Sequence, residues 1–228
     1  MSGDGVTSRT THTMPSDPSA GAGHDPVRSA TMVQDPPTPR PPGALAFVRP
    51  ARPEDAAEIG RIQLTTWRYA YRRILPPEVL HGLDEAWLAQ RWQAAIEAPP
   101  SPRHRVLVAI EQAQKAYLVG FAASGDIDET ALAPDENASD VIRSDIAAVT
   151  DLLVEPRWSR RGHGSRLLAA CVDHWRSDGF TKAVAWAFAA DTAYRSFLTS
   201  AGWQLDGAAR ALDMNGTLVD QVRLHTTL

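Results

Sequence analysis

Cysteine is nearly absent from this sequence, and long apolar runs are missing altogether. Cys171 is the single cysteine among 228 residues, which excludes an internal disulfide framework and a metal site built from several cysteines. No apolar run approaches the ~20 residues of a membrane span. The N-terminus shows no charged start followed by an apolar stretch and a cleavage site. We therefore expect a cytoplasmic protein that neither crosses nor contacts a membrane.

An excess of positive charge is also missing. The formal net charge is −4, so the overall balance gives no sign of a nucleic-acid partner. The histidines stand singly rather than at metal-ligand spacing, and we expect no metal. Apolar residues make up 43% of the chain, which is enough for one globular domain with a substantial core.

The first 43 residues differ in composition from the rest. Gly, Ser, Thr and Pro dominate this segment, which ends in a proline-rich stretch at 36–42. Such a segment cannot bury enough apolar surface to offset the entropy of ordering it. We predict a disordered tail over residues 1–43 and a folded domain over residues 46–228.

The periodicity of the remaining sequence predicts a mixed α/β domain without internal repeats. Strands are expected near 47–51, 105–110, 116–123, 146–154 and 183–188, with a final hairpin around Asn215-Gly216. Helices are expected at 56–72, 77–98, 164–177 and 191–200, and Cys171 is expected to be buried on the third of them. An acidic loop spans 126–140.

A glycine-punctuated basic turn joins the strand at 146–154 to the helix that follows. Its core is the run 160–165, Arg-Arg-Gly-His-Gly-Ser. The first N–H groups of a helix have no internal partner, so a strand, a Gly turn and a helix start together form an anion cradle. Arg160 and Arg161 add positive charge. This pattern predicts a site for a phosphate-bearing ligand.

Three segments together resemble the GNAT superfamily of acyl-CoA-dependent N-acyltransferases. The run 154–165 is similar to the family's strand and pyrophosphate loop, Q/R-x-x-G-x-G/A. The run 191–203 is similar to the family's N-x-x-A-x-x-F-Y-x-x-x-G-F segment. The opening strand at 48–51 and the helices up to Pro76 resemble a bacterial subgroup. The three occur in the family's order and cover about residues 46–228.

The resemblance implies a mostly antiparallel central sheet with a splayed strand pair and flanking helices. It implies transfer of an acetyl group from acetyl-CoA to a primary amine of a small molecule or peptide, by direct attack in a ternary complex. The residues that it assigns to the cofactor come from the strand, the turn and the later helix: Leu153, Val154, Arg160, Arg161, Gly162, His163, Gly164, Ser165, Asp191, Tyr194 and Phe197. The backbone alone of Leu153 and Val154 is assigned this role.

This chain departs from the family at the positions expected to do chemistry. Ser159 stands where Gln or Arg is usual, Ala148 where many members have a Glu base, and Leu198 where many have a Tyr acid. Tyr194 lies one helical turn before Leu198, on the same face, and we predict it as the partner of the leaving thiolate. Asp151 is the nearby candidate for the base, although its strand parity is opposite to that of Ala148.

Other predictions concern the family's acceptor groove, the acidic loop, the His163 side chain and the oligomeric state. Trp67, Tyr69 and Tyr71 are candidates to line the groove, and the alternative for each is ordinary core packing. The acidic loop at 126–140 would favour a cationic amine if it lies near the groove, and is otherwise a solvated loop. The side chain of His163 is expected to face solvent, and the oligomeric state is open, with a homodimer possible.

Two other classes compete with the enzyme. One is an acyl-CoA-binding regulatory or degenerate domain with little turnover, which gains weight from Ala148 and Leu198. The other is a nucleotide-binding protein that uses the same Gly turn. It is disfavoured because no Lys-Ser/Thr follows the glycines and no acid is placed for a ribose.

Overall fold

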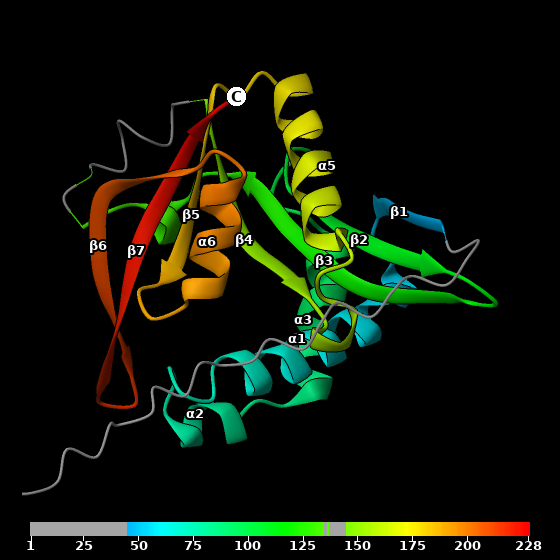
Figure 1. The fold of residues 1–228 in the computed structure, drawn as a ribbon, viewed down its shortest axis with the longest axis horizontal. Coiled ribbons are helices and arrows are strands. Elements are labelled where there is room, and N and C mark those ends of the chain that lie inside the picture. The colour runs from blue at the N-terminus through cyan, green and yellow to red at the C-terminus, as the bar shows by residue number, and fades with distance from the viewer. Residues whose placement is uncertain (1–44, 135, 137–144) are drawn as a thin grey trace, which may run out of the picture. The chain divides into compact units, whose positions relative to one another are not determined.

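The computed structural model describes residues 45–134, 136 and 145–228 (Figure 1). The predicted tail at 1–43 and most of the second half of the acidic loop lie outside these described residues. Within them the chain forms a seven-stranded sheet with the order β1-β2-β3-β4-β5-β7-β6. All neighbouring strands are antiparallel except β4 and β5, which are parallel. The predicted mixed, mostly antiparallel sheet is confirmed.

The elements follow the predicted order. The strands are β1 Leu45–Pro50, β2 Arg105–Gln112, β3 Ala116–Asp126, β4 Ile146–Val154, β5 Lys182–Phe188, β6 Gln204–Met214 and β7 Thr217–Thr227. The helices are α1 Ala56–Ala70, α2 Pro77–His81, α3 Glu85–Glu97, α5 His163–Ser177 and α6 Thr192–Ser200. Short 3-10 turns are η1 Pro53–Asp55, η2 Glu129–Ala131 and η3 Pro156–Trp158.

The helical region predicted over 77–98 consists of two helices, because the chain breaks there into α2 and α3. Gly82 caps the C-terminus of α2. Asp84 then adopts an extended conformation and its side chain accepts a hydrogen bond from the Trp87 backbone N–H at 2.6 Å. A side-chain acceptor at this position satisfies an N–H group that a new helix leaves without a partner. The break turns α3 back onto α1, where Trp92 Nε1 donates to Gln63 Oε1 at 2.7 Å.

Helices cover both faces of the sheet. One face packs against α5 and α6 through a core that includes Leu167, Trp175 and Leu198. The other face packs against α1 and α3 through a core that includes Ile59 and Ile62. Side chains of β4 contribute to both cores, Leu152 to the first and Leu153 to the second. The expected burial of 146–154 on both faces is therefore confirmed.

The parallel pair β4 and β5 opens along its length. Its register runs only from Ile146 opposite Lys182 to Val149 opposite Ala185. Beyond these positions both strands continue without pairing to each other, β4 to Val154 and β5 to Phe188. The predicted splayed pair is therefore present, and its gap lies at the C-terminal ends of β4 and β5 (Figure 1).

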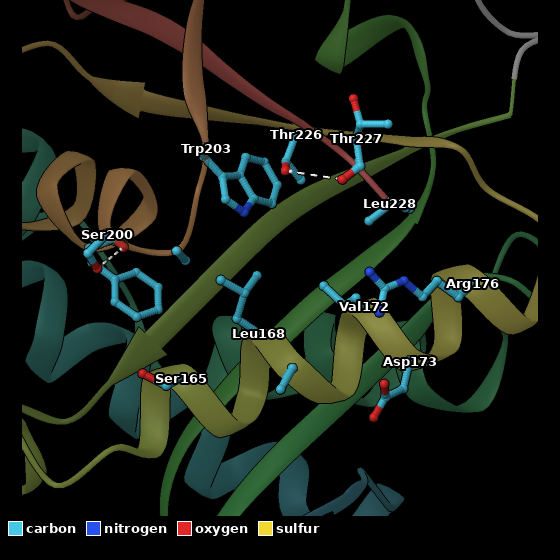
Figure 2. A pocket seen from close by; sticks show the side chains of 13 residues that line it. Ser165, Leu168, Val172, Asp173, Arg176, Ser200, Trp203, Thr226, Thr227 and Leu228 are labelled. Carbon is cyan, nitrogen blue, oxygen red and sulfur yellow. Dashed lines mark hydrogen bonds between the residues drawn. The ribbon is translucent and has the colours of Figure 1, made fainter.

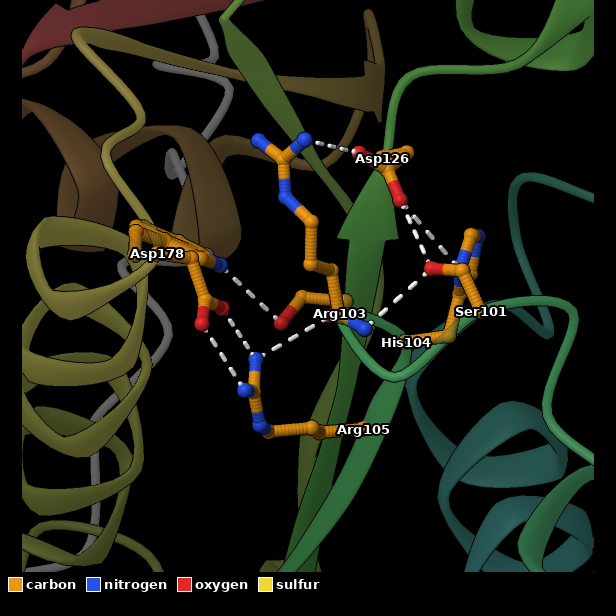
Figure 3. Close-up of polar contacts among 8 residues, drawn as sticks. Ser101, Arg103, His104, Arg105, Asp126 and Asp178 are labelled. Carbon is orange, nitrogen blue, oxygen red and sulfur yellow. Dashed lines mark hydrogen bonds and ion pairs between the residues drawn. The ribbon is translucent and has the colours of Figure 1, made fainter.

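The end of α5 away from the Gly turn is held by a polar network (Figure 3). Arg105 at the start of β2 pairs with Asp178 just after α5, and its Nη2 donates to Asp178 Oδ1 at 2.9 Å. Arg103 pairs with Asp126 at 2.9 Å, and Ser101 Oγ donates to the same carboxylate at 2.7 Å. The Arg105 guanidinium lowers the pKa of Asp178. The Arg105–Asp178 pair fixes the C-terminal end of α5 against β2, and the Asp126 contacts join the segment before β2 to the end of β3.

Arg223 on β7 pairs with two carboxylates, Glu136 of the acidic loop and Asp206 of the neighbouring strand β6. Its side chain is 6% exposed and donates to both oxygens of Glu136 at 2.6 Å and to Asp206 Oδ2 at 2.7 Å. This pairing lowers the pKa of Glu136 to about 2. The contribution of Glu136 to stability is therefore present at neutral pH and is lost as the pH falls toward that value.

We expect Arg223→Met to lower the free energy of unfolding by about 3 kcal/mol, because it leaves two carboxylates without their cation. Urea unfolding at pH 7 measures the loss. The control is Arg52→Met, which removes an exposed pair with Glu54 at 3.7 Å and should cost less than about 1 kcal/mol. Equal losses in the two variants would contradict this account of Arg223.

Candidate active site

The Gly turn lies between β4 and α5 and has an unusual backbone. Arg160 has a φ of 62° and Gly162 a φ of 80°, both in the left-handed region. Helix α5 begins immediately afterwards, and its first regular bond runs from Arg166 N to Gly162 O at 3.1 Å. Helix geometry therefore leaves the N–H groups of Gly164 and Ser165 without an intrahelical acceptor. These groups and the helix dipole make the predicted anion cradle.

The two arginines of the turn have different settings. Arg160 is exposed. The Arg161 side chain is only 10% exposed and is turned inward. Its guanidinium lies 4.8 Å from the centre of the Trp158 ring, and its Nη1 lies 3.8 Å from Glu111 Oε1. The exposed Arg160 is therefore better placed to contact a phosphate directly, whereas the buried Arg161 contributes positive charge from the inner side of the turn.

The prediction that His163 faces solvent is wrong. Its side chain is 1% exposed, and Nε2 lies 3.1 Å from Glu111 Oε2, which is equally buried on β2. As the first residue of α5, His163 directs its side chain into the protein while its backbone stays in the cradle. Sequence reasoning missed Glu111 because the partner lies 52 positions away, on a strand that reads as ordinary core.

The backbone of β4 presents polar groups to the gap. Glu155 N donates to Val119 O of β3 at 2.9 Å, so the groups of Leu153, two residues earlier, face β3 as well. N–H and C=O directions alternate along a strand, which turns Val154 and Leu152 toward the gap left by β5. The predicted pair was Leu153 and Val154. The structure favours Val154 and adds Leu152, which the sequence analysis did not name.

A β-bulge changes which way Asp151 faces. The register of β4 against β3 moves from Ser124 opposite Val149 to Ala123 opposite Asp151, which leaves Thr150 as the extra residue. Ala123 belongs to the core under α1, as does Leu153. Directly opposed residues share a face, so Asp151 lies on the same face as Ala148. The expectation that Asp151 and Ala148 lie on opposite faces of the strand is therefore wrong. Simple alternation would separate them, but the bulge at Thr150 puts them on the same face.

The surroundings of the Asp151 carboxyl raise its pKa above the ordinary value. Loss of contact with water raises its pKa to about 6, against smaller opposing effects from Arg91 and a hydrogen bond to Thr150. A carboxyl group with such a pKa is ionised at neutral pH and is still basic enough to accept a proton. A shifted pKa beside a gap in the sheet is typical of functional groups.

Two tyrosines face the same region. Tyr194 lies in the first turn of α6, and Tyr71 follows the last turn of α1. Burial raises the pKa of both hydroxyls, and the charges of Asp151 and Asp191 raise them further. Asp151 and Asp191 therefore lie close enough to both hydroxyls for their charges to act on them, although the four residues come from three different elements. Asp191 also caps α6, accepting a hydrogen bond from Tyr194 N at 2.9 Å.

The aromatic candidates for the acceptor groove separate in the structure. The Tyr71 ring packs edge-on against Phe188 at 5.0 Å, where β5 ends. Trp67 packs with both the α1–α3 core and the cluster around Phe188, so α1 spans the two strands of the gap. Tyr69 is 58% exposed and lies under the Arg72 guanidinium. Among the three, Tyr71 is the one that the structure brings beside Asp151.

The positions that the family uses for its base and acid are buried core here. Ala148 is 3% exposed and packs with Val184 and the segment around Ala131. Leu198 is 0% exposed and belongs to the core under α5. Any acid–base chemistry at the gap must therefore come from other groups, and Asp151 and Tyr194 are titratable groups that the structure places there.

A groove leads away from the cradle between α5, α6 and the end of β7 (Figure 2). It has a volume of about 520 Å³, and Ser165 at the start of α5 forms one end of its lining. Leu168 and Trp203 give it an apolar floor, and Arg176 and Asp173 lie at its far end. Phe197, a predicted cofactor contact, lines the groove and would lie 3.5 Å from a Cβ added at Gly164.

The described part of the acidic loop packs on the face of the sheet that carries Asp151. Ile127 and Ala131 contact Ala148 and Val184, beside the paired half of β4 and β5. Two of its acidic residues are neutralised by partners, Asp126 by Arg103 and Glu136 by Arg223. The rest of the loop, at 135 and 137–140, lies outside the described residues.

Two kinds of feature are not found in the part of the chain that the structure describes. No helix there is both long and apolar enough to cross a membrane. No group of three or more His, Cys, Asp and Glu side chains there could hold a metal ion.

This fold and site define an N-acyltransferase that depends on an acyl-CoA. The cradle at the start of α5 lies beside a gap between two parallel strands. Asp151 lies on the part of β4 that borders this gap, and its charge acts on the hydroxyls of Tyr71 and Tyr194. The family model described as "Acetyltransferase (GNAT) family" matches residues 63–203. The chain therefore belongs to the GNAT family of acetyltransferases.

Comparisons with individual proteins agree with this assignment. The chain is 26% identical over 142 residues to the uncharacterized N-acetyltransferase YuaI of Bacillus subtilis (strain 168), covering 62% of this chain and 71% of YuaI. It is similar to a PaiA N-acetyltransferase from Thermoplasma acidophilum in complex with coenzyme A, with a TM-score of 0.57, 14% identity, and coverage of 81% and 99% of the two chains.

It is also similar to YncA from Salmonella typhimurium, whose structure contains acetyl-CoA, with a TM-score of 0.56 and 20% identity over 81% and 94% of the chains. At these identities the solved structures show the shared fold alone.

Proposed function

We propose that this protein transfers the acetyl group of acetyl-CoA to a primary amine of a small molecule or peptide, by direct attack within a ternary complex. The observation that carries the proposal is the meeting of three parts at one place. These are the anion cradle of α5, the open edge of β4, and the Asp151 carboxyl with its raised pKa.

The cradle and the groove would hold the cofactor. The N–H groups of Gly164 and Ser165 suit the pyrophosphate, with Arg160 adding charge at the surface. From there the pantetheine arm would enter the gap and bond to the outward backbone groups of Val154 and Leu152, one of which would polarise the thioester carbonyl. The groove that begins at Ser165 offers room for the nucleotide half.

Two groups at the gap suit the proton transfers. Attack on the thioester needs a neutral amine, and an ionised Asp151 can accept the proton that the amine loses. The departing thiolate needs a proton or a hydrogen bond, and the Tyr194 hydroxyl, which is protonated at neutral pH as phenols ordinarily are, can donate one. Asp151 therefore acts as the general base and Tyr194 as the general acid in this proposal.

The second candidate is an acyl-CoA-binding domain with little turnover. The observation that favours it is the identity of Ala148 and Leu198, two buried apolar residues at positions where many family members have an ionisable group. Asp151 and Tyr194 argue against it, because they return a base and an acid to the same gap.

A thiol-release assay with acetyl-CoA and a panel of amines tests the proposal directly. We expect at least one primary amine to raise thiol release well above the rate without an acceptor. The panel should contain small amines, diamines, amino acids and peptides with free N-termini, and mass spectrometry should find the acetylated amine. Tight binding of CoA without turnover on any amine would favour the second candidate, and failure to bind CoA would contradict both.

A further inference from the structure

We propose that Glu111 is a positioning residue that holds the Gly turn in the shape that receives the cofactor's pyrophosphate. This inference rests on the proposed binding of acetyl-CoA at the turn. Glu111 lies near the end of β2 and is 1% exposed, and β3 separates its strand from β4 and the gap where the chemistry would occur. Its carboxylate instead contacts the two residues on either side of Gly162.

The contacts of Glu111 surround the turn from behind. Its Oε2 lies 3.1 Å from His163 Nε2, and its Oε1 lies 3.8 Å from Arg161 Nη1. One carboxylate thus draws inward the side chains that immediately precede and follow Gly162. The N–H groups of the following residues are left on the outer side, where an anion can reach them.

The turn needs such an anchor because its backbone is unfavourable by itself. Arg160 has a φ of 62°, a left-handed conformation that is unfavourable for a residue with a side chain. Gly162 at φ 80° is also left-handed and gives the chain much freedom when nothing restrains it. A strained segment persists only when its surroundings determine it. Without Glu111, the turn would sample shapes that do not form the cradle.

Simple electrostatics and a positioning role predict opposite changes in CoA affinity when the charge of Glu111 is removed. A carboxylate behind an anion site repels the anion, so removing its charge alone would strengthen the binding of CoA. A positioning role requires that binding weaken. If only about a tenth of the molecules keep the competent turn, the apparent affinity falls about tenfold.

The molecule supplies a matched control at the other end of α5. There Asp178 pairs with Arg105 at the start of β2 (Figure 3). A carboxylate thus joins α5 to the same strand near each end of the helix. Asp178→Asn removes a carboxylate from a β2–α5 contact, as Glu111→Gln does, but far from the turn. A merely structural role predicts similar effects of the two substitutions.

The experiment compares Glu111→Gln, Asp178→Asn and the wild-type full chain by calorimetric titration with CoA and by thermal unfolding without ligand. We expect both variants to lower the melting temperature. We expect the Kd for CoA to rise about tenfold in Glu111→Gln and to stay within about twofold of wild type in Asp178→Asn. In turnover, KM for acetyl-CoA should rise in Glu111→Gln while kcat stays unchanged.

Three results would overturn the role of Glu111: unchanged CoA binding, tighter CoA binding, or an equal loss in the two variants. If Glu111→Gln does not fold, Glu111→Asp replaces it. This variant keeps the charge but withdraws it by one methylene, and it should weaken CoA binding in the same direction. Wild-type protein that does not bind CoA would instead refute the proposed function, so the two failures are distinguishable.

Discussion

Asp151→Asn is expected to lower kcat about 10³-fold while the Kd for CoA changes little. Positioned general bases contribute about 10²- to 10⁴-fold to rate, and an amide cannot take the proton of the attacking amine. In wild type, kcat/KM should rise with pH through about 6, the pKa that desolvation gives Asp151, because the ionised form is the active base. In Asp151→Asn, kcat/KM should not show this rise near pH 6.

The same substitution should stabilise the fold. Because burial raises the Asp151 pKa from 3.8 to about 6, the folded chain binds a proton more tightly than the unfolded chain. Stability is therefore lost as the pH rises from about 4 through about 6. At pH 7 the cost is about 2–3 kcal/mol, and Asp151→Asn removes it. Urea unfolding should find the variant more stable at pH 7, with a smaller difference at pH 4.

Asp220→Asn is the matched control, since Asp220 is exposed on β7. It should leave both kcat and the pH profile unchanged. If Asp151→Asn retained the wild-type rate and the rise near pH 6, Asp151 would not be the base. A parallel fall in the rate and in the free energy of unfolding would also count against the proposal, because it would indicate general damage.

Tyr194→Phe should lower kcat about 10²-fold, the lower end of the range for acid–base catalysis. Loss of the hydroxyl leaves the departing thiolate without its proton donor. Acetyl donors with more acidic thiols need that donor less, so the loss should shrink with a thioester of lower thiol pKa. Steady-state rates with two such donors measure this difference.

Tyr71→Phe is the comparison for Tyr194, because Tyr71 shares the same carboxylate neighbours. If Tyr194 alone serves the thiolate, Tyr71→Phe should change the KM of the amine more than kcat. Unchanged turnover with an unchanged pH profile in Tyr194→Phe would end its assignment as the acid. A loss found only in Tyr71→Phe would transfer the role to that residue.

The sequence predicts most of the fold because its local signals agree with one another. The strand at 146–154 matches β4 at both ends, and Asn215-Gly216 lies at the turn between β6 and β7. The break between α2 and α3 was not predicted, although the region over 77–98 was expected to be helical. There the apolar pattern continues across Gly82 and Asp84, and the capping preference of Asp84 outweighs it.

The site was less accessible to sequence reasoning, because its geometry depends on distant partners. The inward side chain of His163 requires Glu111, and nothing local reveals that pairing. The grouping of Tyr71 with Asp151 and Tyr194 requires α1 to span the gap, which the helical pattern does not specify. Backbone features were more predictable, since the glycines and the helix start already imply the cradle.

The bulge at Thr150 also affects how relatives of this chain should be compared. Because Thr150 is an extra residue in β4, every side chain after it lies on the face opposite to the one that simple alternation from Ile146 would give. Counting forward from Ile146 therefore assigns Asp151 to the wrong face, whereas counting back from the Gly turn does not cross the insertion. An alignment anchored on the Gly turn keeps this carboxyl in register with the gap.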